Sequence, residues 1–591
     1  MEVTRTFDLL EQLKEKYAGK DDILSIRKSD GWVKYSVDDY YRISHRLAYG
    51  LLAAGFQAGD RVIIITQNRP EWNFLDMALA LAHLVSIPVY PTLSKEDYRH
   101  ILNHSGARAV FIGQEKIFRN VFPVIEEMPL KPSVYTINPI EGQPNWDVLL
   151  KLGEEKAAEF APVVEENKKN ILPEEVCTII YTSGTTGAPK GVMLTHIGLT
   201  FNAIGHAKME IKNHTHKMLS FLPLCHIYER GMNYEYQYLG ISIYYAEGLG
   251  TIARDMKESH ADGFCAVPRV MEMMFDKLLA KWKELRGIPR WIYGWAFRIA
   301  QEFDYKRTDR CYKLKYAVAD RLVYSKWREA LGGHELLIVS GGSSIQEKII
   351  RLYTAAKMYI FEGYGMTETS PVIAVNNPKD MEIVIGTVGK ILPGIEMKLS
   401  EDGEILTKGI CLMKGYYNNP EATAEVIDED GWFHTGDIGE FNAEGYLRIT
   451  DRKKEIFKLS AGKYIAPQVL ENRFKESPFI ANIMVVGENE KFASALVVPD
   501  FSYLHFWASK HRISFRNNVE LAGMPQVHDR IMKEINIINE GLAPHEQLKR
   551  VHVVADEWSV ATGELSQTMK LKRRVILKKY EKDLQNIYNH E

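Results

Sequence analysis

The alternation of short β-rich runs with helical stretches constrains the fold of this chain more than any other feature. From Arg61 the order is RVIIIT, a helical stretch from Trp72 to Ala82, SIPVY, a second helical stretch from Lys95 to His104, and ARAVFIG. Strands that alternate with helices in this way run parallel, with right-handed crossovers. We therefore predict a large, layered α/β domain.

Similar apolar runs recur further along the chain, and most of them end in Gly, Ser, Thr or Pro. They cover residues 176–182, 217–222, 336–342 and 357–365. Ligands of open α/β sheets bind beyond the carboxyl ends of the strands, where loops expose backbone N–H groups. We therefore expect the functional site to lie at the ends of these runs.

The charge balance argues against a general nucleic-acid binder. The 591 residues include 74 Lys and Arg against 77 Asp and Glu, which gives a formal net charge of -3. The five cysteines are scattered, and none has the C-x-x-C spacing of a zinc site or the pattern of a disulfide framework. We expect no nucleic-acid partner and a cytoplasmic location.

The segment 270–330 is helical, basic and rich in tryptophan. A helical hairpin that packs on the sheet is the simpler interpretation. Tryptophan rings among Lys and Arg also suit the headgroup zone of a membrane, so peripheral contact with the inner membrane face is the alternative. The most apolar long run, residues 77–89, is too short for the roughly 20 residues that a bilayer span needs.

The character of the sequence changes again near residue 450. The turn-rich NAEGYLRIT gives way to the charged DRKKEIFK, and a fresh α/β pattern follows to the end of the chain. In this pattern residues 481–500 are predicted to form a strand hairpin. We therefore predict two domains, residues 1–450 and 451–591, of which the second is smaller.

The segment YTSGTTGAPKGVMLTH, from Tyr181 to His196, is the most informative part of the sequence. Its glycines can aim backbone N–H groups at oxyanions, its hydroxyls can donate hydrogen bonds or help to hold Mg²⁺, and its lysine supplies a positive charge. It lacks the G-x-x-x-x-G-K-[ST] spacing of a P-loop. A surface loop is the alternative. The residues of the predicted phosphate site are Thr182, Ser183, Gly184, Thr185, Thr186, Gly187 and Lys190.

YTSGTTGAPKG resembles the phosphate-loop signature of the adenylate-forming enzymes, which comprise acyl-CoA synthetases, firefly-type luciferases and peptide-synthetase adenylation domains. The resemblance continues in family order through LPLCHIYER, EGYGMTETSP, GWFHTGDIG, DRKKEIFKLSAGKYIAP and TMKLKRR. Within the family the chain is most similar to long-chain fatty acyl-CoA synthetases. The resemblance implies an N-terminal ATP- and acyl-binding domain of βαβ sheets with helices, a possible small β-barrel, and a small, mobile α+β lid domain.

The resemblance also assigns residues of the large domain. Glu368 holds Mg²⁺ together with Thr186, Tyr364 is the platform for adenine, and His226 borders the reacting carboxylate. Taken alone, Glu368 could be a helix N-terminal acid, and His226 a hydrogen-bonded core histidine. The other predicted nucleotide-binding residues of this domain are Gly342, Ser343, Glu362, Gly363, Gly365 and Thr367.

The resemblance assigns Asp437, near the end of the large domain, and Arg452 to the ribose. In the smaller domain it also assigns Lys458 to the nucleotide, Lys454 to the hinge, and Lys570 to adenylation. An aspartate in a Gly-flanked turn is otherwise simple turn chemistry, and a basic run is otherwise a solvated tail. The chain reads ELSQTMK where long-chain relatives more often read ELTPTLK, so the proline is lost but the register of the lysine survives.

The implied reaction is an ATP-dependent ligation in two steps. A long-chain fatty acid attacks ATP to form an acyl-adenylate with release of pyrophosphate, and coenzyme A then takes the acyl group with release of AMP. ATP, Mg²⁺ and coenzyme A are the expected cofactors and co-substrates. The alternatives are a fatty acyl-AMP ligase that loads a carrier protein and a catalytically silent lipid-binding scaffold. Chain-length preference and oligomeric state stay open.

Overall fold

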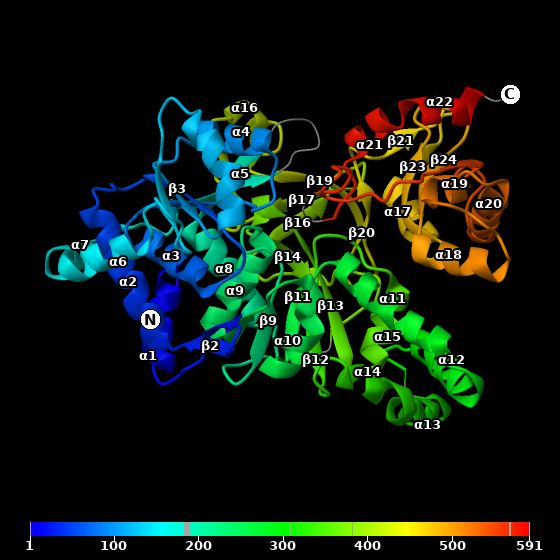
Figure 1. Ribbon diagram of the computed structural model, residues 1–591, viewed down its shortest axis with the longest axis horizontal. Helices are drawn as coiled ribbons and strands as arrows, with labels where there is room; N and C mark the ends of the chain where they lie inside the picture. Colours follow the sequence, from blue (N-terminus) through cyan, green and yellow to red (C-terminus); the bar gives the residue numbers. More distant parts are fainter. Residues whose placement is uncertain (1, 183–188, 308, 381, 567–568, 590–591) are drawn as a thin grey trace. The chain divides into compact units, whose positions relative to one another are not determined.

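The computed structural model describes residues 2–182, 189–307, 309–380, 382–566 and 569–589 (Figure 1). The chain divides into two compact units of mixed α/β structure, which confirms the predicted fold class. The first unit comprises Met1–Met397, Thr407–Phe433 and Gly445–Leu447. The second comprises Lys398–Leu406, His434–Glu444 and Arg448–Glu591.

Within the described residues, seven strands of the first unit form a sheet in the order β18-β8-β7-β4-β3-β5-β6. As predicted, β3 pairs in parallel with β4 and with β5. β7 and β8 are antiparallel, because the connection of residues 183–189 is shorter than the about twelve residues that a parallel crossover needs. The strands are β3 (Arg61–Ile65), β4 (Val85–Pro88), β5 (Ala109–Ile112), β6 (Ser133–Thr136), β7 (Val176–Thr182), β8 (Lys190–Thr195) and β18 (Gly415–Tyr416).

Nine strands in the described part of the first unit form a second sheet, ordered β15-β14-β13-β12-β11-β9-β10-β1-β2. The central strands from β10 to β13 pair in parallel. The strands are β1 (Leu24–Lys28), β2 (Gly31–Tyr35), β9 (Lys217–Ser220), β10 (Ser242–Tyr245), β11 (Gly263–Ala266), β12 (Leu336–Ser340), β13 (Met358–Gly365), β14 (Val372–Val375) and β15 (Lys390–Ile391).

Helices pack on these sheets, and their ends follow local sequence signals. Ser36 and Asp39 form a capping box at the start of α2, and α4 ends at Gly106, which has a positive φ of 57°. The helices are α1 (Asp8–Tyr17), α2 (Val37–Ala53), α3 (Pro70–Leu81), α4 (Lys95–Ser105), α5 (Glu115–Glu126), α6 (Asp147–Glu155), α7 (Ala157–Asn170), α8 (His196–Ala207), α9 (Ile227–Leu239), η1 (Leu249–Thr251), α10 (Ile252–Ser259), α15 (Glu347–Ala355), η3 (Thr367–Thr369) and α16 (Pro420–Ala424).

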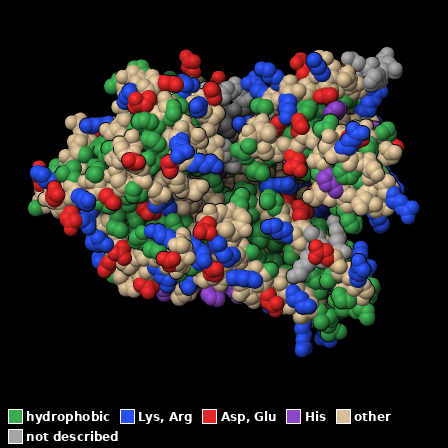
Figure 2. All heavy atoms as spheres, in the orientation of Figure 1, with side chains coloured by type: hydrophobic (Ala, Val, Ile, Leu, Met, Phe, Trp, Pro, Cys, Tyr) green, Lys and Arg blue, Asp and Glu red, His purple; other side chains and the backbone are tan. Residues whose placement is uncertain are grey.

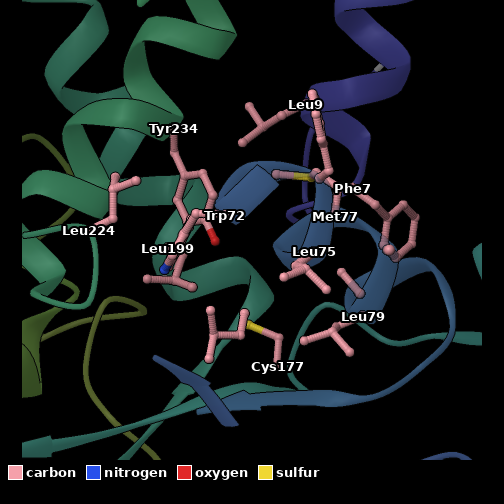
Figure 3. Packing of buried hydrophobic residues seen from close by; sticks show 14 of the residues in the cluster. Phe7, Leu9, Trp72, Leu75, Met77, Leu79, Cys177, Leu199, Leu224 and Tyr234 are labelled. Carbon is pink, nitrogen blue, oxygen red and sulfur yellow. The ribbon is translucent and has the colours of Figure 1, made fainter. Parts of the chain in front are cut away.

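The main core of the first unit lies where α1, α3, α8 and α9 meet. Trp72 of α3 and Tyr234 of α9 are each 1% exposed and lie near each other in Figure 3, among leucines of the neighbouring helices. Every residue of α3 is buried. A helix that is buried on all sides accounts for the long apolar run seen in the sequence.

A buried ion pair crosses this core. Arg230 of α9 is 1% exposed, and its Nη2 lies 2.6 Å from Oδ1 of Asp76 in α3. Its Nη1 donates to Thr178 of β7 over 2.7 Å, and its Nε donates to the hydroxyl of Tyr234 over 2.8 Å. One guanidinium thus connects two helices and a strand.

The basic, tryptophan-rich segment folds as more helices than the predicted hairpin: α11 (Pro268–Glu284), α12 (Gly287–Gln301), α13 (Arg310–Ala319), the π-helix η2 (Asp320–Tyr324) and α14 (Ser325–Glu329). Trp327 is buried, and Trp282 and Trp295 pack partly buried in the same cluster with strands β11–β13, so the predicted packing on the sheet is confirmed. Trp291 is 65% exposed. No helix in the described residues has the length and apolarity to span a bilayer.

Four strands with the order β16-β17-β19-β20 form a small separate sheet. Within the described residues its outer strands, β16 and β20, each have a neighbour on one side only, so the sheet stays open and the possible small β-barrel is not formed. The strands are β16 (Glu396–Leu399), β17 (Glu404–Lys408), β19 (Phe433–Phe441) and β20 (Leu447–Arg452).

The remainder of the second unit is built on the three strands β23, β24 and β25. β23 and β24 form the antiparallel hairpin that the sequence predicted, and β25 joins β24 in parallel. The elements are β21 (Phe457–Lys458), β22 (Tyr464–Ile465), α17 (Pro467–Phe474), β23 (Ile480–Val486), β24 (Ser494–Pro499), α18 (Phe501–Lys510), α19 (Asn518–Ala522), α20 (Pro525–Asn539), β25 (Arg550–Val553), α21 (Arg573–Lys579) and α22 (Glu581–Asn589).

Candidate functional site

The predicted phosphate loop joins two paired strands. Thr182, the last residue of β7, is the antiparallel partner of Lys190, the first residue of β8. Lys190 therefore lies at the base of the loop. Five of the predicted phosphate-binding residues lie outside the described residues, and their roles stay predictions: Ser183, Gly184, Thr185, Thr186 and Gly187.

Tyr416, which is not among the residues predicted from the sequence, contacts Glu368 and Lys190. Its hydroxyl donates to Oε1 of Glu368 over 2.9 Å, and Nζ of Lys190 lies 4.8 Å from the centroid of its ring. Burial, and then the negative charge of Glu368, raise the pKa of the Tyr416 hydroxyl. The only sequence signal was its position after a glycine in KGYY, which is also typical of a simple turn.

Predicted nucleotide-binding residues lie at the end of β13. A side chain at Gly365 would place its Cβ 1.8 Å from the carbonyl oxygen of Pro371, so only glycine fits there. Tyr364 and Gly363 are partly exposed, and Thr367 is buried in η3. Burial, together with the nearby charge of Glu347, raises the pKa of the Glu362 carboxyl to about 8, so this predicted binding residue carries a buried, largely protonated side chain at neutral pH.

Two more of the predicted nucleotide-binding residues, Gly342 and Ser343, follow β12. Gly342 and Ser343 are both exposed, and Gly342 has a φ of +80°. At the preceding Gly341, a Cβ would lie 3.2 Å from the ring of Tyr228, and the Tyr228 hydroxyl donates to the carbonyl of Val339 over 2.9 Å. The start of α9 and the end of β12 are therefore in close contact.

His226 caps the N-terminus of α9. Its Nδ1 accepts the backbone N–H of Tyr228 over 3.2 Å, so in the neutral ring the proton is on Nε2. The ring is only partly buried. The capping bond orients the imidazole, and its role beside a reacting carboxylate stays a prediction.

In the second unit the predicted ribose residues pair with each other. Nε of Arg452 lies 3.3 Å from Oδ1 of Asp437, which is 6% exposed. The next residue, Lys453, contacts Asp402 over 2.7 Å and Glu404 over 2.8 Å. The predicted hinge residue Lys454 follows β20 in an exposed turn.

The basic run that contains Lys570 is folded and is not a solvated tail. The backbone N–H of Lys570 donates to Oγ of Ser566 over 3.0 Å, and the N–H of Ser566 donates to the carbonyl of Lys570 over 2.8 Å. Arg573 pairs with Glu455 over 3.0 Å and with Glu471 over 2.5 Å. The predicted nucleotide residue Lys458, by contrast, is exposed, with Nζ 5.5 Å from the ring centroid of Tyr464.

One other cluster in the first unit has the composition of a metal site. His206, Glu210 and Glu235 are buried, and one possible ligand atom of each lies within 4.8 Å of the others. The buried ammonium of Lys212 lies 3.3 Å from Glu210 and 3.4 Å from Glu235. Burial opposes the charge of Lys212, but the two carboxylates raise its pKa. The cluster thus contains its own balancing cation.

Comparison with known protein families gives two matches. The AMP-binding enzyme family matches residues 11–417, and the AMP-binding enzyme C-terminal domain matches residues 454–591.

Two curated relatives match over most of their length. The chain is 32% identical to the long-chain-fatty-acid–CoA ligase FadD15 of Mycobacterium tuberculosis over 97% of this chain and 95% of that protein. It is also 32% identical to long-chain-fatty-acid–CoA ligase 1 of Cavia porcellus, over 96% and 84% of the two chains.

Solved structures share the fold. The adenylation domain of a carboxylate reductase from Mycobacterium chelonae superimposes with a TM-score of 0.74 at 20% identity, over 99% of this chain and 91% of that one. A fatty acyl CoA synthetase from Mycobacterium tuberculosis gives 0.62 at 22% identity, over 98% and 99%. At these identities the likeness establishes the fold alone.

Proposed function

The chain belongs to the AMP-binding enzyme family, and from this premise we propose that it is an ATP-dependent ligase that joins a long-chain fatty acid to coenzyme A. The fatty carboxylate attacks the α-phosphorus of ATP and releases pyrophosphate, and the acyl-adenylate then passes its acyl group to the thiol of coenzyme A with release of AMP. The 32% identity to a long-chain-fatty-acid–CoA ligase over 97% of the chain carries this proposal.

Formation of the acyl-adenylate requires fixed positive charge, because the fatty carboxylate must approach the triphosphate, which is a polyanion. Lys190 provides such a charge at the base of the phosphate loop. Glu368 offers a partly exposed carboxylate, a hard oxygen ligand of the kind that Mg²⁺ prefers, and we assign it and Thr186 to the metal. Mg²⁺ neutralises negative charge on the phosphates when bound.

We further assign Tyr364 to the adenine and the paired Asp437 and Arg452 to the ribose. Nε of Arg452 lies 3.3 Å from Oδ1 of Asp437, so the two residues are already held together. A carboxylate can accept hydrogen bonds from the hydroxyls of a ribose.

We also propose that residues 1–450 bind ATP and the acyl group and that residues 451–591 act as a lid that rotates about Lys454 between the two steps. One site must receive two different second substrates, and rotation would withdraw Lys570 and admit the pantetheine arm. The exposed turn at Lys454 supports this assignment, because a hinge needs a position that can change its backbone angles without disturbing a core.

Lys454→Pro is expected to slow thioester formation roughly tenfold or more and to change adenylation much less, because proline fixes φ near −65°. The measurement compares pyrophosphate release without coenzyme A with conversion of supplied acyl-adenylate to acyl-CoA. Lys454→Ala, which keeps the backbone free, is the control. Equal loss of both half-reactions in the proline variant would reject the hinge.

A panel of acids from acetate to oleate, assayed for AMP formation with coenzyme A, tests the overall function. We expect AMP and pyrophosphate as products and the highest rates with long chains. If AMP release requires a carrier protein in place of coenzyme A, the chain is an acyl-AMP ligase. If ATP is not consumed with any acid, the chain is a silent scaffold.

We propose that the chain is cytoplasmic and that α12 and α13 contact an anionic lipid surface. All five cysteines lie among the described residues and are free thiols, which fits a reducing compartment. Neither helix contains an acidic residue. Figure 2 shows hydrophobic side chains together with Lys and Arg at the lower right, where these helices lie in Figure 1. The exposed apolar residues are Ile288 (74%), Trp291 (65%), Leu314 (71%) and Val318 (44%).

The double variant Trp291→Ser, Leu314→Ser is expected to weaken binding to phosphatidylglycerol-containing vesicles about tenfold, because both apolar contacts with the lipid are lost. Co-sedimentation with vesicles that contain or lack phosphatidylglycerol measures this. Leu130→Ser, at an 87% exposed leucine outside these helices, is the matched control. Equal binding by the double variant and the control would contradict the assignment, as would equal binding of the wild type to both kinds of vesicle.

A further inference from the structure

Tyr416 is held rigidly beside the strand that follows the phosphate loop. Its backbone belongs to β18, where it is the antiparallel partner of Val192 in β8. Its N–H donates to Oγ1 of Thr423 over 2.9 Å, and the next residue, Tyr417, donates its N–H to the carbonyl of Gly191 over 2.7 Å. The backbone from which the Tyr416 ring extends is therefore held in place next to Lys190.

The same short segment also fixes Glu368. The backbone N–H of Met413 donates to the carbonyl of Glu368 over 2.8 Å, and the Tyr416 hydroxyl donates to Oε1 of the same residue over 2.9 Å. Tyr416 is only 8% exposed. Main chain and side chain of Glu368 are thus both tied to residues 413–416.

The ring and the hydroxyl of Tyr416 interact with groups of opposite charge. The face of an aromatic ring attracts an ammonium group, and Nζ of Lys190 lies 4.8 Å from the ring centroid. The hydroxyl donates a hydrogen bond to the carboxylate of Glu368 over 2.9 Å. A hydrogen bond to a charged acceptor is stronger than a neutral one and holds the carboxylate in one orientation.

We propose that Tyr416 is a positioning residue that holds the Lys190 ammonium and the Glu368 carboxylate in place for ATP and its divalent cation. This inference rests on the proposed function. Each charged group has its own contact on the tyrosine: the ammonium has the ring face, and the carboxylate has the hydroxyl. Both groups are therefore set before the nucleotide arrives, and less conformational entropy is lost when it binds.

The test uses the full chain and two substitutions that separate the contacts. Tyr416→Phe removes the hydroxyl but keeps the ring, and Tyr416→Leu removes both. ATP binding is measured by calorimetry without fatty acid, once with Mg²⁺ and once with EDTA. Tyr417→Phe is the matched control, because that ring faces Arg61 and His104.

We expect Tyr416→Phe to weaken ATP binding roughly tenfold with Mg²⁺ and to leave it unchanged in EDTA, because only the carboxylate loses its partner. The Mg²⁺ concentration that gives half-maximal adenylation should rise in parallel, with the maximal rate recovered at high Mg²⁺. Tyr416→Leu should weaken binding in EDTA as well, because Lys190 loses the ring. Tyr417→Phe should bind ATP as the wild type does.

If Tyr416→Phe weakens ATP binding equally with and without Mg²⁺, the proposal is overturned, since a general packing defect has that signature. Wild-type affinity in Tyr416→Phe would overturn it too. The comparison of Tyr416→Phe in the two buffers decides the matter even if Tyr416→Leu fails to fold. If the wild type itself neither binds ATP nor forms AMP, the proposed function fails, which is a separate result.

Discussion

Replacing Lys570 by alanine is expected to lower the rate of acyl-adenylate formation by about two to three orders of magnitude, the range seen when a fixed group that stabilises transition-state charge is removed. The fatty carboxylate and the triphosphate repel each other, and on our assignment Lys570 supplies positive charge between them. Thioester formation from supplied acyl-adenylate should change little, because the acid is already activated and no carboxylate has to approach the triphosphate.

Rapid-quench measurement of pyrophosphate release, followed by addition of acyl-adenylate and coenzyme A, gives both rates on one preparation. Lys572→Ala, at an exposed basic neighbour, is the control and should leave both rates near those of the wild type. A Lys570→Ala protein that cannot convert supplied acyl-adenylate would show that the lysine does not act specifically in adenylation.

Asp76→Ala is expected to destabilise the first unit by about 3–5 kcal/mol, because it leaves the buried guanidinium of Arg230 without its counter-ion. Burial disfavours the charged guanidinium, but the carboxylate of Asp76 raises the pKa of Arg230, so this charge persists in the folded chain. The midpoint and slope of urea unfolding measure the change.

Asp38→Ala is the matched control, because the Asp38 side chain is 61% exposed and pairs with Lys14 on the surface. That change should cost no more than about 1 kcal/mol. The double variant Asp76→Leu, Arg230→Met removes both charges and should recover much of the stability. Similar losses in Asp76→Ala and Asp38→Ala would show that the buried pair contributes little.

Local sequence patterns predicted the elements well where a run had a single clear period. The strand at 61–65, the helix at 70–81 and the hairpin of β23 and β24 lie where the patterns placed them. Strand partners were harder to predict, since pairing depends on segments far apart in the chain. The pairing of β7 with β4 and the open four-stranded sheet depend on contacts between segments far apart in the chain, which no local window contains.

In the candidate site, too, some residues could be predicted from local motifs and others could not. Lys190 and Glu368 were recognisable because family motifs surround them, whereas Tyr416 was missed because a tyrosine after a glycine has no periodicity that marks it as functional. The basic run at 568–574 resembles a solvated tail when read alone. Arg573 instead forms ion pairs with Glu455 and Glu471, which lie more than a hundred residues away in the sequence. Only the fold brings these residues together.

The pairing of Arg573 with Glu455 has a mechanical consequence for the proposed cycle. Glu455 directly follows the proposed hinge residue Lys454, so this ion pair joins the segment that carries Lys570 and Arg573 to the hinge. If the lid rotates about Lys454, the ion pair would make Lys570 move together with the lid. On the proposed hinge, opening toward the thiol would therefore withdraw Lys570, and one rotation would set the order of the two half-reactions.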